Sequence, residues 1–259
     1  MKKTKLVLAI SGKGGVGKTT LAALMLKILT EKKQKSILVI DANPDSNLSN
    51  LLGIPTVKKT VGNVTDELKK SLGKGEIPPN VTKKDILEYR IFEILEETPN
   101  FDLLVMGRSE GEGCYCLLNK LLADIIDTLS KNYDLTIMDE HAGLEHLSRR
   151  TDRNVDVMII VTDPSSMGFQ TARRIKELAK EVHIEFKKVY LVGNKFTPEM
   201  QPMLGSEANK MGVEHAGNIP YDDNVLRYNL TGRPLVELLP MSPALVAAKN
   251  ILIRMGLLD

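Results

Sequence analysis

One short stretch near the N-terminus restricts the fold more than any other part of the chain. Residues 12–19 read GKGGVGKT, a glycine-rich segment that ends in lysine and threonine. An apolar run, KLVLAI at 5–10, precedes it, and a helical pattern at 18–32 follows it. A glycine-rich turn between a strand and a helix lets successive backbone N–H groups surround an anion, and the helix dipole adds to the attraction. The pattern therefore predicts a phosphate-binding loop in an α/β fold.

The rest of the chain continues this alternation of short apolar runs and longer amphipathic segments. Near-continuous apolar runs are typical of strands that are covered on both faces. The expected strands are 5–10, 36–41, 101–107, 134–139, 155–162 and 188–194. The expected helices are 18–32, 117–131, 167–182, 198–211 and 242–255. We therefore expect a single α/β domain over 1–259, with a mostly parallel sheet, helices on both faces and an exposed excursion around 55–85.

Composition narrows the class of protein further. The 259 residues are 42% hydrophobic and 26% charged, which is ordinary for a globular protein. A net charge of +2 gives no reason to expect nucleic acid or an anionic membrane as partner. No apolar run reaches the roughly 18 residues of a spanning helix, and the N-terminal run is too short for a secretion signal. With two cysteines, the chain is expected in the reducing cytoplasm.

Several side chains of the phosphate-binding loop and of two strand ends are candidates for nucleotide binding. Lys18 is expected to reach the β- and γ-phosphates of a nucleotide, and the Thr19 hydroxyl is a candidate ligand for Mg²⁺. Asp41 and Asp139 end two predicted strands, where side chains face the ligand crevice of a parallel sheet, and Asp139 is the second candidate for Mg²⁺. The predicted nucleotide-binding residues of the loop are Gly12, Lys13, Gly14, Gly15, Val16, Gly17, Lys18, Thr19 and Thr20.

The chain's only cysteines, Cys114 and Cys116, lie close together in EGEGCYCLLN, just before a predicted helix. A helix N-terminus lowers a thiol pKa and so favours the thiolate, which is the form that binds metals. Soft metals commonly take four ligands, and a two-fold symmetric dimer would supply four thiolates. Three alternatives remain open: two inert buried cysteines, a strained local disulfide, and an iron–sulfur cluster held between protomers.

The form KGGVGKT, with a second lysine at Lys13, resembles the deviant Walker A loop of the MinD/ParA/nitrogenase-iron-protein class of P-loop NTPases. The resemblance implies an ATP-linked homodimer in which Lys13 contacts the partner's nucleotide, where an added cation stabilises the transferring phosphoryl group. It also implies that Asn194 recognises adenine, although the residue alone is equally compatible with a turn. The other implied residues of the nucleotide pocket are Lys195, Pro220 and Asp222.

Position 43 departs from this class. Relatives usually have Asp-x-Asp-Pro, whereas this chain has Asp41-Ala42-Asn43-Pro44. The missing carboxylate is the one expected to orient the attacking water, and an amide cannot accept a proton in its place. We expect an ATPase that forms ADP and phosphate slowly. Its candidate catalytic residues are Lys13, Lys18 and Asn43.

Two further blocks, MGRSEGEGCYCLLNKLL and MDEHAGLEHLSRRT (138–151), resemble the CooC/AcsF-type ATPases that mature nickel enzymes. The resemblance runs from the phosphate-binding loop to GNIPYDDNV at 217–225. It implies an ATP-dependent metallochaperone that carries Ni²⁺, with Zn²⁺ as a competitor, on Cys114 and Cys116 of two protomers. The implied client is carbon monoxide dehydrogenase or acetyl-CoA synthase. His146 is a weaker candidate ligand, because a lone histidine beside a loop is more often a hydrogen-bonding residue.

Other functions compete with this one. A partition or positioning ATPase of the ParA/MinD kind would need a basic face for DNA or a basic amphipathic tail, but SPALVAAKNILIRMGLLD carries only Lys249 and Arg254. A nitrogenase-like reductase would need cysteines at two separate positions, and this chain has one Cys-x-Cys locus. The partition ATPase and an iron–sulfur scaffold ATPase stay as alternative functions.

Overall fold

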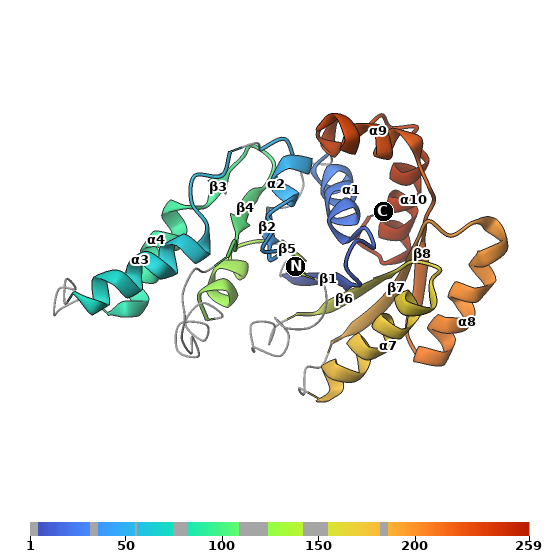
Figure 1. Cartoon of the computed structure of the whole chain (residues 1–259), viewed down its shortest axis with the longest axis horizontal. Coiled ribbons are helices and arrows are strands. Elements are labelled where there is room, and N and C mark those ends of the chain that lie inside the picture. Colours follow the sequence, from blue (N-terminus) through green and yellow to red (C-terminus); the bar gives the residue numbers. More distant parts are fainter. Residues whose placement is uncertain are drawn as a thin grey trace.

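A computed structural model gives the structure of the chain, and it describes residues 5–31, 36–54, 56–74, 82–108, 124–141, 155–181 and 186–258. The strands of this part form one eight-stranded sheet in the order β3-β4-β2-β5-β1-β6-β7-β8 (Figure 1). All neighbours are parallel except β3 and β4. The strands are β1 (Leu6–Gly12), β2 (Ile37–Asp41), β3 (Glu96–Glu97), β4 (Asp102–Val105), β5 (Leu135–Asp139), β6 (Val157–Thr162), β7 (Lys188–Asn194) and β8 (Glu214–Ile219).

Helices cover both faces of the sheet, as the sequence predicts. Helices α1 and α10 pack on one face, and α3, α4, α7 and α8 pack on the other (Figure 1). The α-helices are α1 (Lys18–Glu31), α2 (Leu48–Leu51), α3 (Val61–Gly73), α4 (Lys83–Glu93), α7 (Ser166–Glu181), α8 (Gln201–Met211), α9 (Asp223–Thr231) and α10 (Pro243–Arg254). Two short 3-10 helices are η1 (Pro198–Met200) and η2 (Leu235–Glu237). Among the described helices, none is long and apolar enough to cross a bilayer.

The central strands explain why the α/β prediction is correct. Strands β2, β5 and β6 are buried along their whole length. In β1, Leu8 and Ile10 belong to the core under α1, whereas Ala9 belongs to the core on the opposite face. Side chains of a strand alternate between faces, so a strand that is covered twice must be apolar at consecutive positions. Burial of each large aliphatic side chain contributes about 1.5–3 kcal/mol, and the two cores together hold the sheet in place.

The region around 55–85 differs from the exposed excursion that we expected. Helix α3 occupies 61–73 and buries Val64 and Leu68 in the core with α4. The side chains of Thr60 and Asn63 form a capping box that starts this helix. The Gly, Pro and Lys content of 73–84 suggested a loop, but the helical spacing of the apolar residues before it determines the structure. Residues 75–81 lie outside the described part of the chain.

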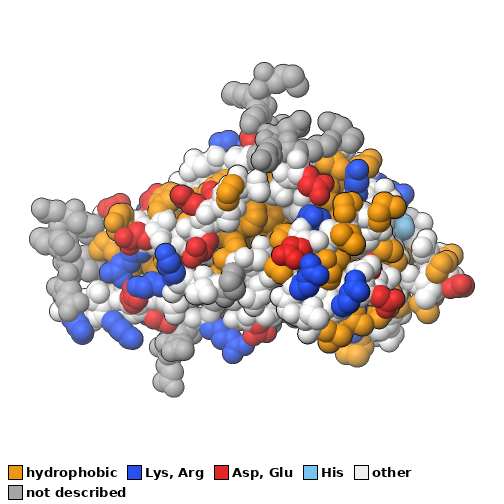
Figure 2. Space-filling model, turned by 90° about the horizontal axis from the view of Figure 1, so that it is seen from above, with side chains coloured by type: hydrophobic (Ala, Val, Ile, Leu, Met, Phe, Trp, Pro, Cys, Tyr) orange, Lys and Arg blue, Asp and Glu red, His pale blue; other side chains and the backbone are white. Residues whose placement is uncertain are grey.

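Two elements near the C-terminus were also not predicted. Strand β8 lies at the edge of the sheet and buries only Ala216 and Ile219, so it has no continuous apolar run. Helix α9 buries a single residue, Tyr228. The expected helix at 117–131 is seen as helical residues at 124–130, and its first part is not described. Lys, Arg, Asp and Glu side chains are intermixed on the face shown in Figure 2.

Candidate functional site

The loop between β1 and α1 has the shape of a phosphate cradle. A Cβ at Gly12 would lie 2.3 Å from the carbonyl oxygen of Val161, and one at Gly17 would lie 2.3 Å from Nδ2 of Asn194. Gly17 also has a φ of +99°, which L side chains rarely adopt. Helix α1 begins at Lys18, so its unpaired N–H groups face the loop. Glycines are therefore required here by close packing, and an anion is favoured by the helix N-terminus.

Lys18 provides the cation of the cradle. Its Nζ donates hydrogen bonds to the carbonyl oxygens of Gly12, at 3.3 Å, and of Lys13, at 3.1 Å. Burial lowers the pKa of Lys18, and the charges of Asp139 and Glu140 oppose that shift. A phosphate oxygen is a stronger acceptor for an ammonium group than a neutral carbonyl. The side chain is thus well placed to bind the phosphate chain of a nucleotide.

Asp139 at the end of β5 is the best candidate for a cation ligand. It is fully buried, and neither carboxylate oxygen accepts a well-formed hydrogen bond from the described residues. The pKa of Asp139 is raised to about 7, mainly by burial and also by the charge of Asp41. The Thr19 hydroxyl and Lys18 oppose this shift. A buried carboxylate without satisfied acceptors is costly unless a cation is near. Thr19 and Asp139 therefore fit a Mg²⁺ ion, which prefers oxygen ligands.

Asp41 shapes the loop after β2 and does not line the cavity. Its two carboxylate oxygens accept hydrogen bonds from the backbone N–H groups of Asn43, at 3.0 Å, and Leu48, at 3.1 Å. Burial raises the pKa of Asp41 to about 6, although both hydrogen bonds lower it. Asn43 in turn accepts the N–H of Asp45 with Oδ1 at 3.1 Å. The loop is therefore ordered by its own side chains, with Asn43 in the cavity wall.

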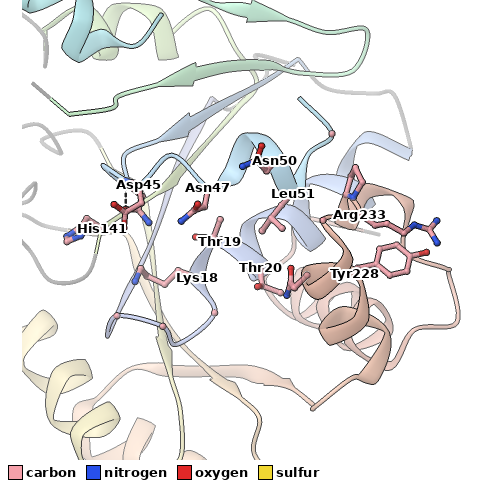
Figure 3. A pocket seen from close by; sticks show the side chains of 18 residues that line it. Lys18, Thr19, Thr20, Asp45, Asn47, Asn50, Leu51, His141, Tyr228 and Arg233 are labelled. Atoms are coloured by element: carbon pink, nitrogen blue, oxygen red, sulfur yellow. Dashed lines mark hydrogen bonds between the residues drawn. The ribbon is translucent and has the colours of Figure 1, made fainter. Parts of the chain in front are cut away.

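A cavity of about 880 Å³ extends from the cradle along the start of α1. Figure 3 shows Lys18, Asp45 and His141 at one end and Tyr228 and Arg233 at the other. Thr19 and Thr20 lie between these ends. The lining residues are Gly14, Gly15, Gly17, Lys18, Thr19, Thr20, Asn43, Asp45, Asn47, Asn50, Leu51, Gly53, His141, Tyr228, Asn229, Gly232, Arg233 and Pro234.

Sequence reasoning missed much of this wall. His141 lies inside the block MDEHAGLEHLSRRT at 138–151 but was not singled out. The guanidinium carbon of Arg233 lies 4.4 Å from the centre of the Tyr228 ring, so these two side chains stack at the far end. They come from the end of α9 and the turn after it, and no sequence pattern marked either element. Asn50 comes from α2, which was not predicted either.

The residues implied for the adenine pocket divide into two groups. Asn194 lies against the cradle, where its Nδ2 donates to the carbonyl oxygen of Val16 at 2.7 Å. Asp222 instead caps α9: its Oδ1 accepts the N–H of Asn224 at 2.8 Å, and its Oδ2 accepts the N–H of Ala244 at 3.0 Å and the Ser242 hydroxyl. Hydrogen bonds from Ser242 and these backbone groups outweigh burial and lower the pKa of Asp222.

None of the four residues implied for that pocket lines the cavity, so adenine recognition stays a prediction. They are Asn194, Lys195, Pro220 and Asp222. Lys195 adopts a φ of +62°, which is uncommon for a residue other than glycine, directly after β7.

Lys13 is bound within its own chain. Its Nζ lies 3.1 Å from Oδ2 of Asp163 and 3.4 Å from the Ser165 hydroxyl, both in the turn after β6. Burial would raise the pKa of Asp163, but hydrogen bonds from Ser165 and Lys13 outweigh it and leave the pKa below its usual value. No sequence pattern indicates this acceptor, since strands β1 and β6 become neighbours only in the folded sheet.

Cys114, Cys116 and His146 lie outside the described residues. Among those described, no cluster of three or more His, Cys, Asp or Glu side chains could hold a metal. The strand that leads to the cysteines, β4, is described, and it pairs with β2, so its end lies beside the loop after β2. The Met106 N–H donates to the Asp41 carbonyl at 2.9 Å, and Arg108 pairs with Asp45 at 2.5 Å between the guanidinium and carboxylate.

A glycine cradle at the carboxyl end of a parallel sheet, with a lysine and a buried aspartate beside it, defines a P-loop nucleotide-binding protein. The model of the CobQ/CobB/MinD/ParA nucleotide-binding domain matches residues 7–235. The chain belongs to this family. Relatives include the uncharacterized ATP-binding protein MJ0685 of Methanocaldococcus jannaschii, which is 52% identical over 90% of this chain and 91% of its own length.

Another relative is the carbon monoxide dehydrogenase accessory protein CooC of Rhodospirillum rubrum, which is 29% identical over 90% of each chain. Solved structures of similar fold include a chain of the MinC:MinD cell division protein complex of Aquifex aeolicus, with a TM-score of 0.70, 22% identity and coverage of 97% of this chain and 95% of that one. A ParA family ATPase from Chlorobium tepidum matches with a TM-score of 0.74, 19% identity and coverage of 97% and 99%. At these identities the structural likeness concerns the fold alone.

Proposed function

We propose that the chain is an ATP-dependent metallochaperone that carries nickel on Cys114 and Cys116 and delivers it to a nickel enzyme. The observation that carries this proposal is the proximity of the loop after β2 to the chain that leads to the cysteines. Asp45 lines the nucleotide cavity, and it pairs with Arg108, six residues before Cys114. A change at the phosphates thus has a short physical path to the Cys-x-Cys segment.

The chain's own residues supply the parts of a nucleotide-driven cycle. Lys18 and the backbone of the glycine loop hold the phosphates, and Thr19 and Asp139 would hold Mg²⁺, which offsets the negative charge of the phosphates. Attack of water on the γ-phosphorus breaks its bond to the bridging oxygen and yields ADP and phosphate. With Asn43 in place of a carboxylate, this step is slow. ATP therefore persists long enough to stabilise a homodimer through Lys13.

The dimer would complete the cargo site. Two Cys-x-Cys pairs provide four thiolates, which suit Ni²⁺ and also the competitor Zn²⁺. Loss of the γ-phosphate would then loosen the dimer and release the metal to the client. The name of the relative CooC supports carbon monoxide dehydrogenase as the kind of client, and acetyl-CoA synthase is the second candidate.

The test is an anaerobic Ni²⁺ titration of the whole chain, with and without Mg·ATP. Thiolate-to-metal charge transfer and molar mass are followed in the same samples. We expect one Ni²⁺ per two chains, coupled to dimer formation and lost in Cys114→Ser and Cys116→Ser. If Mg·ATP produced a dimer that bound no metal, the carrier function would be contradicted. Nucleotide-linked dimerisation would still be supported.

Family membership also favours a partition or positioning ATPase of the MinD/ParA kind, because that family name covers such proteins. This function predicts nucleotide-linked dimerisation in which both cysteines can be replaced without effect. An iron–sulfur scaffold ATPase would be distinguished by visible absorbance, since a cluster is coloured and Zn²⁺ is silent. We expect neither result.

A further inference from the structure

The two ends of the nucleotide cavity fix where the terminal phosphate of ATP lies. The loop backbone cradles the α- and β-phosphates, and the lysine of the cradle reaches the β- and γ-phosphates. Lys18 lies at the end formed with Asp45 and His141, whereas Thr20 lies toward Tyr228 (Figure 3). The ribose and base therefore leave past Thr20, and the γ-phosphate points toward Asp45 and His141.

The side chains at this phosphate end differ in what they can offer an anion. Lys18 is the cation of the cradle. Asp45 repels phosphate, and its ion pair with Arg108 only partly offsets that repulsion. Asn43 accepts the Asp45 N–H with its Oδ1 and has only its amide Nδ2 to offer an anion. His141 is the other neutral donor, half-buried in the cavity wall directly after Asp139 and Glu140. Either neutral tautomer of imidazole has one N–H to donate.

We infer that His141 binds the γ-phosphate of ATP and thereby distinguishes ATP from ADP. This inference rests on nucleotide binding at the cradle, as proposed above. An N–H donated to a phosphate oxygen is a charge-assisted hydrogen bond, and ADP has no oxygen at that position to accept it. The contact also links the nucleotide state to the chain after β5, because His141 directly precedes residues 142–154.

The experiment compares the affinities for ADP and for a non-hydrolysable ATP analogue, both with Mg²⁺, by calorimetry. It uses protein concentrations at which light scattering shows a monomer with either ligand. The variants are His141→Ala, which removes the donor, and His141→Gln, which keeps an N–H donor on a side chain of similar length. Asn229→Ala is the matched control, since Asn229 lines the cavity and directly follows Tyr228 in α9.

In His141→Ala we expect the affinity for the ATP analogue to fall about tenfold and that for ADP to change less than about twofold. His141→Gln should recover most of the loss, and Asn229→Ala should affect both ligands equally. A parallel fall for both ligands in His141→Ala, or no change for either, would overturn the inference. Failure of the wild-type chain to bind either nucleotide would instead overturn the proposed function.

Discussion

Nζ of Lys13 lies 3.1 Å from Oδ2 of Asp163, so the lysine implied to act on a partner's nucleotide is held by its own chain. The Lys13 and Asp163 side chains are 30% and 28% exposed, respectively. An ion pair with this exposure contributes at most about 1 kcal/mol. Lys13 must leave Asp163 before it can cross a dimer interface. In the homodimer proposed above, the pair would therefore oppose dimerisation weakly, once in each protomer.

Replacement of Asp163 by Asn should release this lysine. The amide keeps an acceptor for the N–H of Ser165 at the same place but removes the charge that attracts Lys13. We expect the dimer formed with Mg·ATP to tighten about two- to tenfold, measured by analytical ultracentrifugation. Lys13→Ala combined with Asp163→Asn should dimerise no better than Lys13→Ala alone. A weaker dimer in the single Asp163→Asn variant would contradict this account.

Burial of Asp139 makes the stability of the Mg²⁺-free protein depend on pH. Its pKa is about 7 in the fold against an ordinary 3.8, so the native state binds the proton more tightly than the unfolded chain. This contribution is fully present below pH 4 and is lost as pH rises through 7. In the wild type, this carboxyl group should lower the unfolding free energy by on the order of 2–4 kcal/mol between pH 5 and 8. Asp139→Asn should remove that part of the fall.

Urea unfolding in the presence of a chelator measures this effect at each pH. Asn47→Ala is the matched control, because Asn47 lines the same cavity and carries no ionisable group. It should leave the pH dependence unchanged. Equal slopes in wild type and Asp139→Asn would show that the buried carboxylate does not govern this range.

The phosphate cradle and the central strands could be predicted because their signals are local. GKGGVGKT lies within eight consecutive residues, and strands β2, β5 and β6 show their burial as near-continuous apolar runs. The contact between Lys13 and Asp163 could not be predicted, since 150 positions separate the two residues and only the parallel pairing of β1 with β6 joins them. Tyr228 and Arg233 escaped because α9 has only nine residues and buries one of them, and Arg233 lies in the turn after it.

Helix α3 was missed although its signal was present. Leu68 is fully buried with Val64 in the core on the α7 side of the sheet. Leu68→Ala should lower the unfolding free energy by about 2–5 kcal/mol, because a cavity remains where the side chain packed. Leu230→Ala is the control, since Leu230 is 77% exposed, and should change it by less than about 0.5 kcal/mol. If both variants lost similarly little unfolding free energy, the result would instead support the exposed excursion that we expected around 55–85.

Replacement of Asn194 tests whether this residue supports the phosphate-binding loop or recognises the adenine base. Its Nδ2 donates to the Val16 carbonyl, so Asn194→Ala should loosen the loop and weaken ATP and GTP alike, about three- to tenfold. Fluorescence titration with labelled nucleotides measures both. Asn218→Ala is the control, because Asn218 bonds only the backbone of Phe196 among the contacts found for its side chain. A loss for ATP alone would support adenine recognition instead.

Asn43 governs the rate of hydrolysis in this account. Asn43→Asp would place a carboxylate in the cavity wall, while the retained Oδ1 still accepts the N–H of Asp45. A group that orients water and accepts its proton typically contributes about 10²–10⁴-fold, so we expect kcat to rise at least about tenfold with little change in KM. Phosphate release under saturating Mg·ATP measures kcat. Asn47→Asp adds the same charge to the same wall and should not accelerate the reaction. Equal acceleration by both variants would assign the effect to charge alone and remove Asn43 from the catalytic step.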